Sequence, residues 1–350
     1  MRINSVLPVN AEPVAIVPAV RRFGPPLLRL AGGVIVLVLL GRQVGAGPFH
    51  DGLRAVSWSA IVAALVLTAM TTVCSAWRWR VVARALGVGI ALLPAVGAYY
   101  RSQFLNSVLP GGVLGDVHRA VAHGRRAGDL GRGLRAVAWE RLCGQVVQAV
   151  VSAIVLLALP SPMHPALLYL LAGVGGMAGC AALAVCVAAR RGRSRPAVVA
   201  RAVVKDLRRG LLTRKIWPQL TLASVLVVVG HTTTFVIAAR VAGSTAPLGE
   251  LVALLMLVQT AMVIPLSVGG WGPREGAAAW AFTAAGFSAG LGVTVTTLYG
   301  VIALVAVAPG AGLLLHDAIR RARRPRAVAI LATGSEVSQP AQGELEAIRG

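Results

Sequence analysis

Two glycine-containing segments carry the charged residues best placed to do chemistry in this chain. The first, residues 109–116, ends in Asp116, and the second, residues 265–275, ends in Arg274 and Glu275. Each segment interrupts an apolar run of helical length. In lipid, a freed backbone group and a charge are both costly, so such interruptions persist only where protein or water surrounds them. Their presence in both halves of the chain predicts two broken helices around one central site, as in transporters.

The polar residues around the first break allow two interpretations. Asp116 follows Gly115, where a new helix would begin, so its carboxylate could simply cap that helix. Alternatively, Arg119 lies one turn later on the same helical face, and the pair could hold a headgroup or relay a proton. Asn106 lies in the apolar run before the break and must find a polar partner there.

Glu140 and Arg141 lie near the start of another long apolar run. Adjacent residues on a helix point in different directions, so these two are not expected to pair with each other. By helical rise, Glu140 lies only about 9 Å into the run, which allows a role at headgroup level. A carboxylate at bilayer depth costs a few kcal/mol unless it is paired or protonated, so Arg119 or Arg274 is the alternative partner.

The second break suggests an anion site. Glu275 lies in the first turn of the following helix, where it could act only as a cap. Arg274 has no other basic residue nearby in the sequence. A guanidinium beside the backbone N–H groups of Gly269, Gly270 and Gly272 would form a phosphate-binding nest. Ser267 could add a hydroxyl.

The composition indicates that a membrane surrounds these residues. Of the 350 residues, 57% are hydrophobic and 13% are charged, and the mean hydropathy is +0.76. A soluble domain carries roughly 25% charged residues. The net charge of +22 could suggest nucleic acid, but the basic residues lie in loops between apolar runs. Contact with anionic lipid headgroups explains this placement better than contact with nucleic acid.

Motifs for soluble enzymes and for metal or cofactor binding are not found in the sequence. The four cysteines lie within apolar runs without metal-ligand spacing. There is no phosphate-loop signature, nucleophile elbow, zinc helix or dinucleotide fingerprint. We therefore expect no cofactor and no metal.

The apolar runs predict the fold class. A membrane-crossing helix needs about 20 mostly apolar residues. Two runs, 90–109 and 248–266, lead into the breaks and are followed by shorter arms at 113–123 and 274–289. We expect an all-α integral membrane protein with about six full transmembrane helices and two broken or re-entrant helical hairpins, arranged as an inverted repeat. The six full spans are expected at 26–44, 56–76, 134–159, 166–189, 217–241 and 291–316.

The basic loops predict the orientation and the domain limits. Short loops rich in arginine stay in the cytoplasm, which places both termini there. With this topology, the first hairpin enters from the cytoplasmic side and the second from the outer side. We expect a cytoplasmic tail at 1–20, a transmembrane domain at 21–318 with a basic cytoplasmic loop at 190–216, and a flexible cytoplasmic tail at 319–350.

Two features of the expected inner surface have structural interpretations. Apolar residues recur every fourth position in the basic loop, which predicts a short amphipathic helix on the inner leaflet or, alternatively, a solvated loop. Trp77 and Trp79 alternate with arginines, a pattern typical of an interfacial anchor. The apolar residues of the loop are Val199, Val203, Leu207 and Leu211.

Three motifs, found in this order within residues 106–119, 140–142 and 265–276, resemble the transmembrane domain of lysylphosphatidylglycerol synthase. Their most telling parts are Asn-Ser-Val-Leu-Pro-Gly-Gly, Glu-Arg-Leu and Gly-Gly-Trp-Gly-Pro-Arg-Glu-Gly. The resemblance spans roughly residues 20–318. It implies a multi-helix membrane protein that moves, or is proposed to move, lipids between leaflets.

This chain departs from the family pattern in three respects. Gly144 stands where members often carry Asp, which puts a proton role shared with that Asp in doubt. Val268 stands where many have Pro, which only softens the break. The synthase carries a soluble aminoacyl-transferase domain, whereas the roughly 34 residues after the last expected span here are too few for a catalytic core. We expect a stand-alone membrane domain that is not an enzyme.

These inferences predict a lipid translocator of the bacterial plasma membrane, acting on an anionic or aminoacylated phospholipid or a polyprenyl-phosphate lipid. Arginines and glycine amides would hold the phosphate, and carboxylates an amine or a coupling proton. A membrane-embedded transferase for a lipid-linked substrate and a non-transporting envelope scaffold remain alternatives, as does a homo-oligomer. The substrate-binding candidates are Asn106, Asp116, Arg119, Glu140, Arg141, Ser267, Gly269, Gly270, Arg274 and Glu275.

Overall fold

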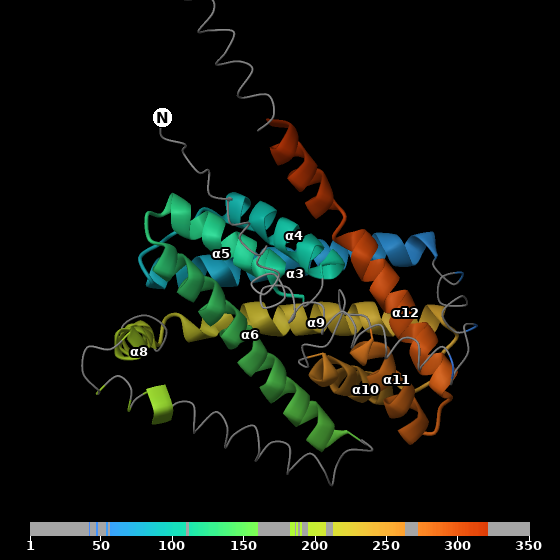
Figure 1. Ribbon diagram of the computed structural model, residues 1–350. Coiled ribbons are helices and arrows are strands. Elements are labelled where there is room, and N and C mark those ends of the chain that lie inside the picture. Colours follow the sequence, from blue (N-terminus) through green and yellow to red (C-terminus); the bar gives the residue numbers. More distant parts are fainter. Residues whose placement is uncertain are drawn as a thin grey trace, which may run out of the picture.

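In the computed structural model, every regular element of the described chain is a helix (Figure 1). The described residues are 57–109, 112–159, 195–207, 213–262 and 272–320, with a few isolated positions elsewhere. The predicted all-α membrane class is therefore confirmed over this part of the chain.

Several predictions concern other parts of the chain. Nearly all of the expected spans at 26–44 and 166–189 lies outside the described residues, as do the N-terminal tail and the C-terminal tail from residue 321 onward. Residues 319 and 320, expected in the flexible tail, are helical.

Four helices are long and apolar enough to cross a membrane, and they match four of the expected spans. They are α3 (Trp58–Ala85), α6 (Leu130–Ala158), α9 (Trp217–Val241) and a helix at Ala289–Arg320, whose first part is α12 (Ala289–Ala306). Their lengths of 25 to 32 residues exceed the roughly 20 residues that a bilayer requires.

The two helical pairs expected around the breaks are both present. The first pair is α4 (Leu92–Val108) with α5 (Leu114–Arg126), and the second is α10 (Leu248–Ala261) with α11 (Pro273–Ala284). In each pair the two short helices pack against each other. The inverted relation between the pairs stays a prediction.

Glycine and capping chemistry explain where the second arm of each pair begins. Gly112 and Gly272 have φ values of 61° and 104°, a backbone region that residues other than glycine rarely adopt. At α11, the backbone N–H of Gly272 donates to Oε2 of Glu275 at 2.7 Å, and Pro273 occupies the first helical position. The chain can therefore turn sharply and start a new helix within a few residues.

Each hairpin packs into its own hydrophobic core beside the spanning helices (Figure 1). Helices α4 and α5 pack on α3 and α6, around the buried side chains of Trp79 and Tyr99. Helices α10 and α11 pack with α9 and α12, around Phe235 and Phe282. The interpretation of Trp79 as an interfacial anchor was wrong: its side chain is 0% exposed, because α3 continues past the expected span and packs under the first hairpin.

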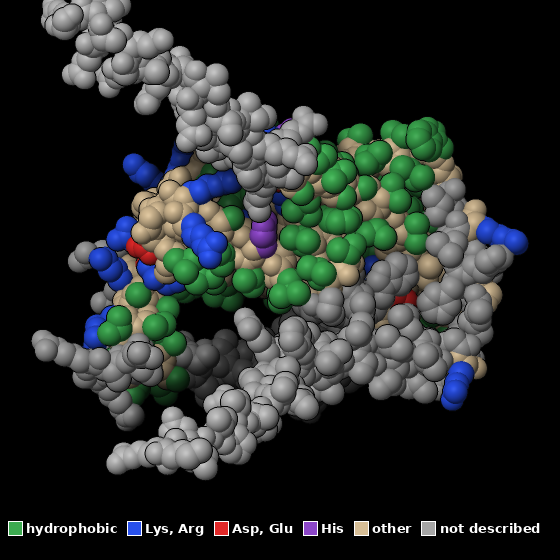
Figure 2. All heavy atoms as spheres, turned by 45° about the horizontal axis from the view of Figure 1, so that its top comes forward, with side chains coloured by type: hydrophobic (Ala, Val, Ile, Leu, Met, Phe, Trp, Pro, Cys, Tyr) green, Lys and Arg blue, Asp and Glu red, His purple; other side chains and the backbone are tan. Residues whose placement is uncertain are grey.

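The outer surface of the helices agrees with a lipid environment. Figure 2 shows hydrophobic side chains over one part of this face, whereas arginine and lysine side chains gather mainly at one end. A water-soluble monomer rarely exposes so much contiguous apolar surface. Exposed apolar side chains on α3, α6 and α9 include Val62, Val66, Val150, Ile154, Leu222 and Val229.

Helix α8 (Arg195–Asp206) forms within the basic loop, as the amphipathic pattern predicted. The expected apolar face was partly wrong. Val199 is 61% exposed, whereas the small side chains of Ala197 and Ala200 are buried. The carboxylate of Asp206 accepts a hydrogen bond from Nε of Arg135 on α6 at 2.7 Å. This tertiary contact sets the rotation of α8, and the sequence periodicity could not reveal it.

Candidate functional site

Asp116 lies at the centre of a buried polar cluster where α5 begins. Its side chain accepts hydrogen bonds from Oγ of Ser102 at 3.0 Å, Nδ2 of Asn106 at 3.0 Å and Nη2 of Arg119 at 2.8 Å. Arg141 on α6 also donates to it through Nη2. Because these partners come from α4, α5 and α6, the carboxylate joins three helices and does more than cap one.

Glu140 is the second carboxylate of the cluster and is fully buried. It accepts hydrogen bonds from Nε of Arg78 at 2.9 Å, the hydroxyl of Tyr99 at 2.8 Å and Nη2 of Arg119 at 3.0 Å. Of the two partners expected for Glu140, Arg119 is confirmed. Arg274 is not its partner, since it pairs with a different carboxylate.

The first hairpin can reach this geometry because glycine lies at its closest approach. A Cβ at Gly115 would overlap the backbone carbonyl oxygen of Ser102. The N–H of Gly115 also donates to Oδ1 of Asn106 at 2.8 Å. Asn106 therefore finds the polar partners that its place in an apolar run required, and it ties the end of α4 to the start of α5.

Counting formal charges shows that the cluster is positive. Three guanidinium groups (Arg78, Arg119 and Arg141) face two carboxylates (Asp116 and Glu140), which leaves one positive charge in excess. All four carboxylate oxygens already accept hydrogen bonds from side chains. A further ligand of this cluster would therefore be an anion rather than an amine.

Sequence reasoning missed three members of the cluster: Arg78, Tyr99 and Ser102. A signal for two of them exists in hindsight, since Tyr99, Ser102 and Asn106 follow one another at spacings of three and four on one face of α4. Arg78 lies beyond the expected end of the second span, and it faces inward only because α3 runs on to Ala85.

The second break holds a separate buried ion pair. Arg274 is 4% exposed, and its Nε donates to Oε1 of Glu275 at 2.9 Å. The other carboxylate oxygen of Glu275 is the one that accepts from Gly272, so the capping interpretation of Glu275 is supported by geometry. The guanidinium carbon of Arg274 lies 5.8 Å from the ring centre of Tyr299. A Cβ at Gly300 would overlap Nη2 of Arg274.

The expected role of Gly272 in a phosphate-binding nest beside Arg274 is wrong, because its backbone N–H donates to Oε2 of Glu275 and is not open to a phosphate. Ser267, Gly269 and Gly270 lie outside the described residues.

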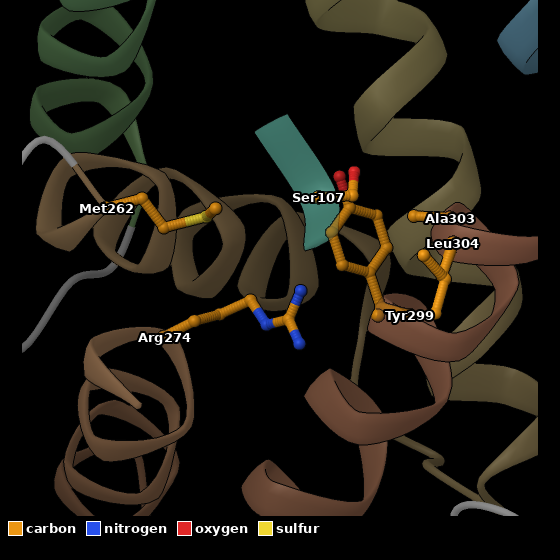
Figure 3. A pocket seen from close by; sticks show the side chains of 7 residues that line it. Ser107, Met262, Arg274, Tyr299, Ala303 and Leu304 are labelled. Atoms are coloured by element: carbon orange, nitrogen blue, oxygen red, sulfur yellow. The ribbon is translucent and has the colours of Figure 1, made fainter. Parts of the chain in front are cut away.

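A cavity of about 140 Å³ connects the ends of the two hairpins (Figure 3). Ser107 comes from the end of α4, Met262 follows α10, and Arg274 begins α11. Figure 3 shows the guanidinium of Arg274 pointing toward Tyr299 and Ser107. The volume corresponds to about four or five water molecules. The other lining residues among those described belong to α12: Tyr299, Gly300, Ala303 and Leu304.

The described residues offer no obvious metal site. Within the part of the chain that the structure describes, no three His, Cys, Asp or Glu side chains gather as a metal ion would require.

Comparison with known proteins agrees with this architecture. Residues 27–310 match the family model described as the lysylphosphatidylglycerol synthase TM region. The chain belongs to this family. The match confirms the resemblance seen in the three sequence motifs, and with the four long apolar helices it makes the chain a multi-pass membrane protein. No curated protein sequence matches the chain.

Both breaks of this lysylphosphatidylglycerol synthase TM-region protein fall within the matched residues. The hairpins, the ion cluster and the cavity therefore all belong to the family domain.

Proposed function

We propose that this protein moves lipids with an anionic headgroup between the leaflets of the bacterial plasma membrane and does not convert them chemically. The main support is the cavity bounded by the ends of both broken hairpins, with Arg274 pointing into it. Membership of the lysylphosphatidylglycerol synthase TM-region family supports a role with membrane lipids.

Arg274 is the group that would recognise the headgroup. A guanidinium binds phosphate through parallel charge-assisted hydrogen bonds. Pairing with Glu275 orients the guanidinium, and Gly300 leaves space for it against α12. A volume of about 140 Å³ suits a phosphate group with some water, while the acyl chains would remain in the bilayer.

The Asp116–Glu140 cluster would serve as the rigid part of the first hairpin. Its excess positive charge favours an anionic headgroup nearby. Because its carboxylate oxygens are occupied by arginine and polar donors, the proposal assigns them no amine. Rocking of one hairpin with its core against the other would open the cavity alternately to each leaflet.

The proposal is tested with purified protein in vesicles that hold fluorescent phosphatidylglycerol, with fluorescent phosphatidylcholine for comparison. Translocation is followed by quenching of the outer leaflet. We expect Arg274→Gln to slow phosphatidylglycerol movement by about tenfold or more, since a charge-assisted contact with the phosphate is lost. The matched control is Arg84→Gln, an exposed arginine at the end of α3, which should stay within about twofold of wild type.

A second variant keeps the positive charge of Arg274 and changes only the position of its guanidinium group. Gly300→Ala places a Cβ where Nη2 of Arg274 lies, so the guanidinium must shift, and translocation should fall toward the rate of Arg274→Gln. Gly312→Ala is the control, because nothing lies within 4 Å of its added Cβ.

Two results would overturn the proposal. One is no movement above protein-free vesicles for phosphatidylglycerol, its lysyl form, cardiolipin and a polyprenyl phosphate, which would favour the scaffold. The other is turnover of a lipid-linked substrate into a new compound, which would favour the transferase.

A further inference from the structure

A second, smaller cavity lies between the last part of α3, the middle of α4 and the middle and end of α5. The charged and aromatic residues that line it are Trp79, Arg101, His118, Arg119, His123 and Arg126. Its volume is about 30 Å³, the share of one water molecule in the liquid. The proposed translocation path does not use this cavity.

Two arginines that line this cavity carry buried donors without acceptors among the described residues. Nε and Nη1 of Arg119, whose side chain is almost fully buried, have no hydrogen-bond partner there, and neither does Nε of Arg101. Leaving a buried donor unpaired is destabilising, because the group has lost its water and gained no acceptor. The rings of Trp79 and Tyr99 lie 4.6 and 4.0 Å from the guanidinium carbon of Arg119, but an aromatic ring is only a weak acceptor.

Each of these two arginines is held in place by an ion pair through another of its nitrogens. Nη2 of Arg119 pairs with Asp116 and Glu140, and Nη1 of Arg101 pairs with Asp317 at 3.0 Å. Arg126 is exposed at the end of α5 and makes no ion pair with the described residues. Among the described residues, no carboxylate lines the cavity, so its lining is basic.

We infer that this cavity binds a phosphate group, with one oxygen inside at the unpaired nitrogens of Arg101 and Arg119. The cavity has room for one oxygen atom only. The phosphorus and the other oxygens would stay at the mouth, beside the exposed side chains of His118 and Arg126. Several arginine donors around one anion form strong charge-assisted hydrogen bonds.

The phosphate could belong to a lipid headgroup or to a free phosphate compound, and the chemistry at the cavity is the same. Binding there requires no translocation, so the inference goes beyond the proposed function.

Binding is measured by calorimetry on the full chain in a nonionic detergent at physiological ionic strength, about 0.15 M. The probes are inorganic phosphate and a short-chain phosphatidylglycerol, with chloride and short-chain phosphatidylcholine as comparisons.

Two variants change the cavity, and each has a matched control on the same helix or at its end. Arg126→Gln removes the charge at the mouth, and Arg125→Gln is its control, because Arg125 is an exposed neighbour that does not line the cavity. Ala122→Leu fills the cavity without a change of charge. Ala127→Leu is its control, because Ala127 is exposed at the C-cap of α5 and does not line the cavity.

We expect Arg126→Gln to weaken phosphate binding about fivefold and Ala122→Leu to weaken it about tenfold or more, with both controls within about twofold. Binding of both probes means that the phosphate group suffices. Binding of phosphatidylglycerol alone identifies a membrane lipid as the source, and binding of inorganic phosphate alone identifies a free compound. Each of these results supports the site if Arg126→Gln weakens binding more than Arg125→Gln does.

The inference is overturned if neither probe binds saturably, if chloride binds as tightly as phosphate, or if the two arginine variants behave alike. Its failure is separable from that of the proposed function. Arg274→Gln should slow translocation as stated above and leave phosphate binding at this cavity unchanged.

Discussion

Neutralising Glu140 should destabilise the protein more than neutralising an acidic residue outside the cluster. Glu140→Gln keeps the shape of the side chain but replaces one carboxylate oxygen with an NH₂ group. In the native cluster, one oxygen of Glu140 accepts from Arg78 and Tyr99 and the other from Arg119. A glutamine amide can accept on one side only, so on the other side its NH₂ would face another donor.

The expected loss of stability follows from the charges that remain in the cluster. Three guanidinium groups would then face Asp116 alone, so the excess rises from one positive charge to two. Breaking a buried ion pair by removing one partner costs about 3–5 kcal/mol. For a chain of this size, this lowers the midpoint of thermal unfolding by about 4–7 °C.

The assay is thermal unfolding in detergent, followed by intrinsic fluorescence at matched protein concentration. The control is Glu250→Gln in the first turn of α10, which is partly exposed and should cost less than about 1 kcal/mol. Adding Arg78→Gln to Glu140→Gln returns the excess to one positive charge. The double variant should therefore be more stable than the sum of the two single losses predicts, by about 2 kcal/mol.

The reasoning about the ion cluster is refuted if Glu140→Gln unfolds within about 2 °C of wild type. It is also refuted if the losses of the single variants simply add.

Two further predictions concern packing around α6. Gly144→Ala should destabilise the protein by about 1–3 kcal/mol in the same unfolding assay, because its Cβ would lie 2.8–2.9 Å from the guanidinium of Arg78. The control, Gly131→Ala on the exposed start of α6, should be neutral or stabilising. Asp206→Asn should speed tryptic cleavage in the basic loop several-fold, because the ion pair with Arg135 holds α8 against α6. Cleavage at the wild-type rate would show that other contacts hold α8 in place.

Much of the fold could be predicted because its causes are local. Long apolar runs predicted α3, α6, α9 and α12, since a bilayer requires a minimum length of apolar helix. The glycines at 112 and 272 allowed the positive φ values at which the hairpins turn. The sequence also showed which polar residues lie near the breaks. Seven of the ten candidates, Glu275 among them, have buried or partly buried hydrogen-bond partners in the structure.

The choice of partners could not be predicted because it depends on which helices touch. Arg78 and Glu140 are 62 positions apart, and only the packing of α3 against α6 brings them together. The packing of α3 under α4 and α5 buries Trp79, which the sequence pattern placed at the membrane surface. Arg274 bonds to its neighbour Glu275 because the helix start folds the two side chains together, so it is not the partner of Glu140.

The sequence by itself determined the spanning helices, the two breaks and the placement of charge beside them, because hydropathy and backbone freedom act within a few residues. The tertiary structure alone decided the excess charge of the buried cluster, the cavity between the two hairpins and the second cavity with its unpaired arginine donors. Each of these depends on contacts between helices far apart in the chain, where packing selects one arrangement among many that the same local patterns allow.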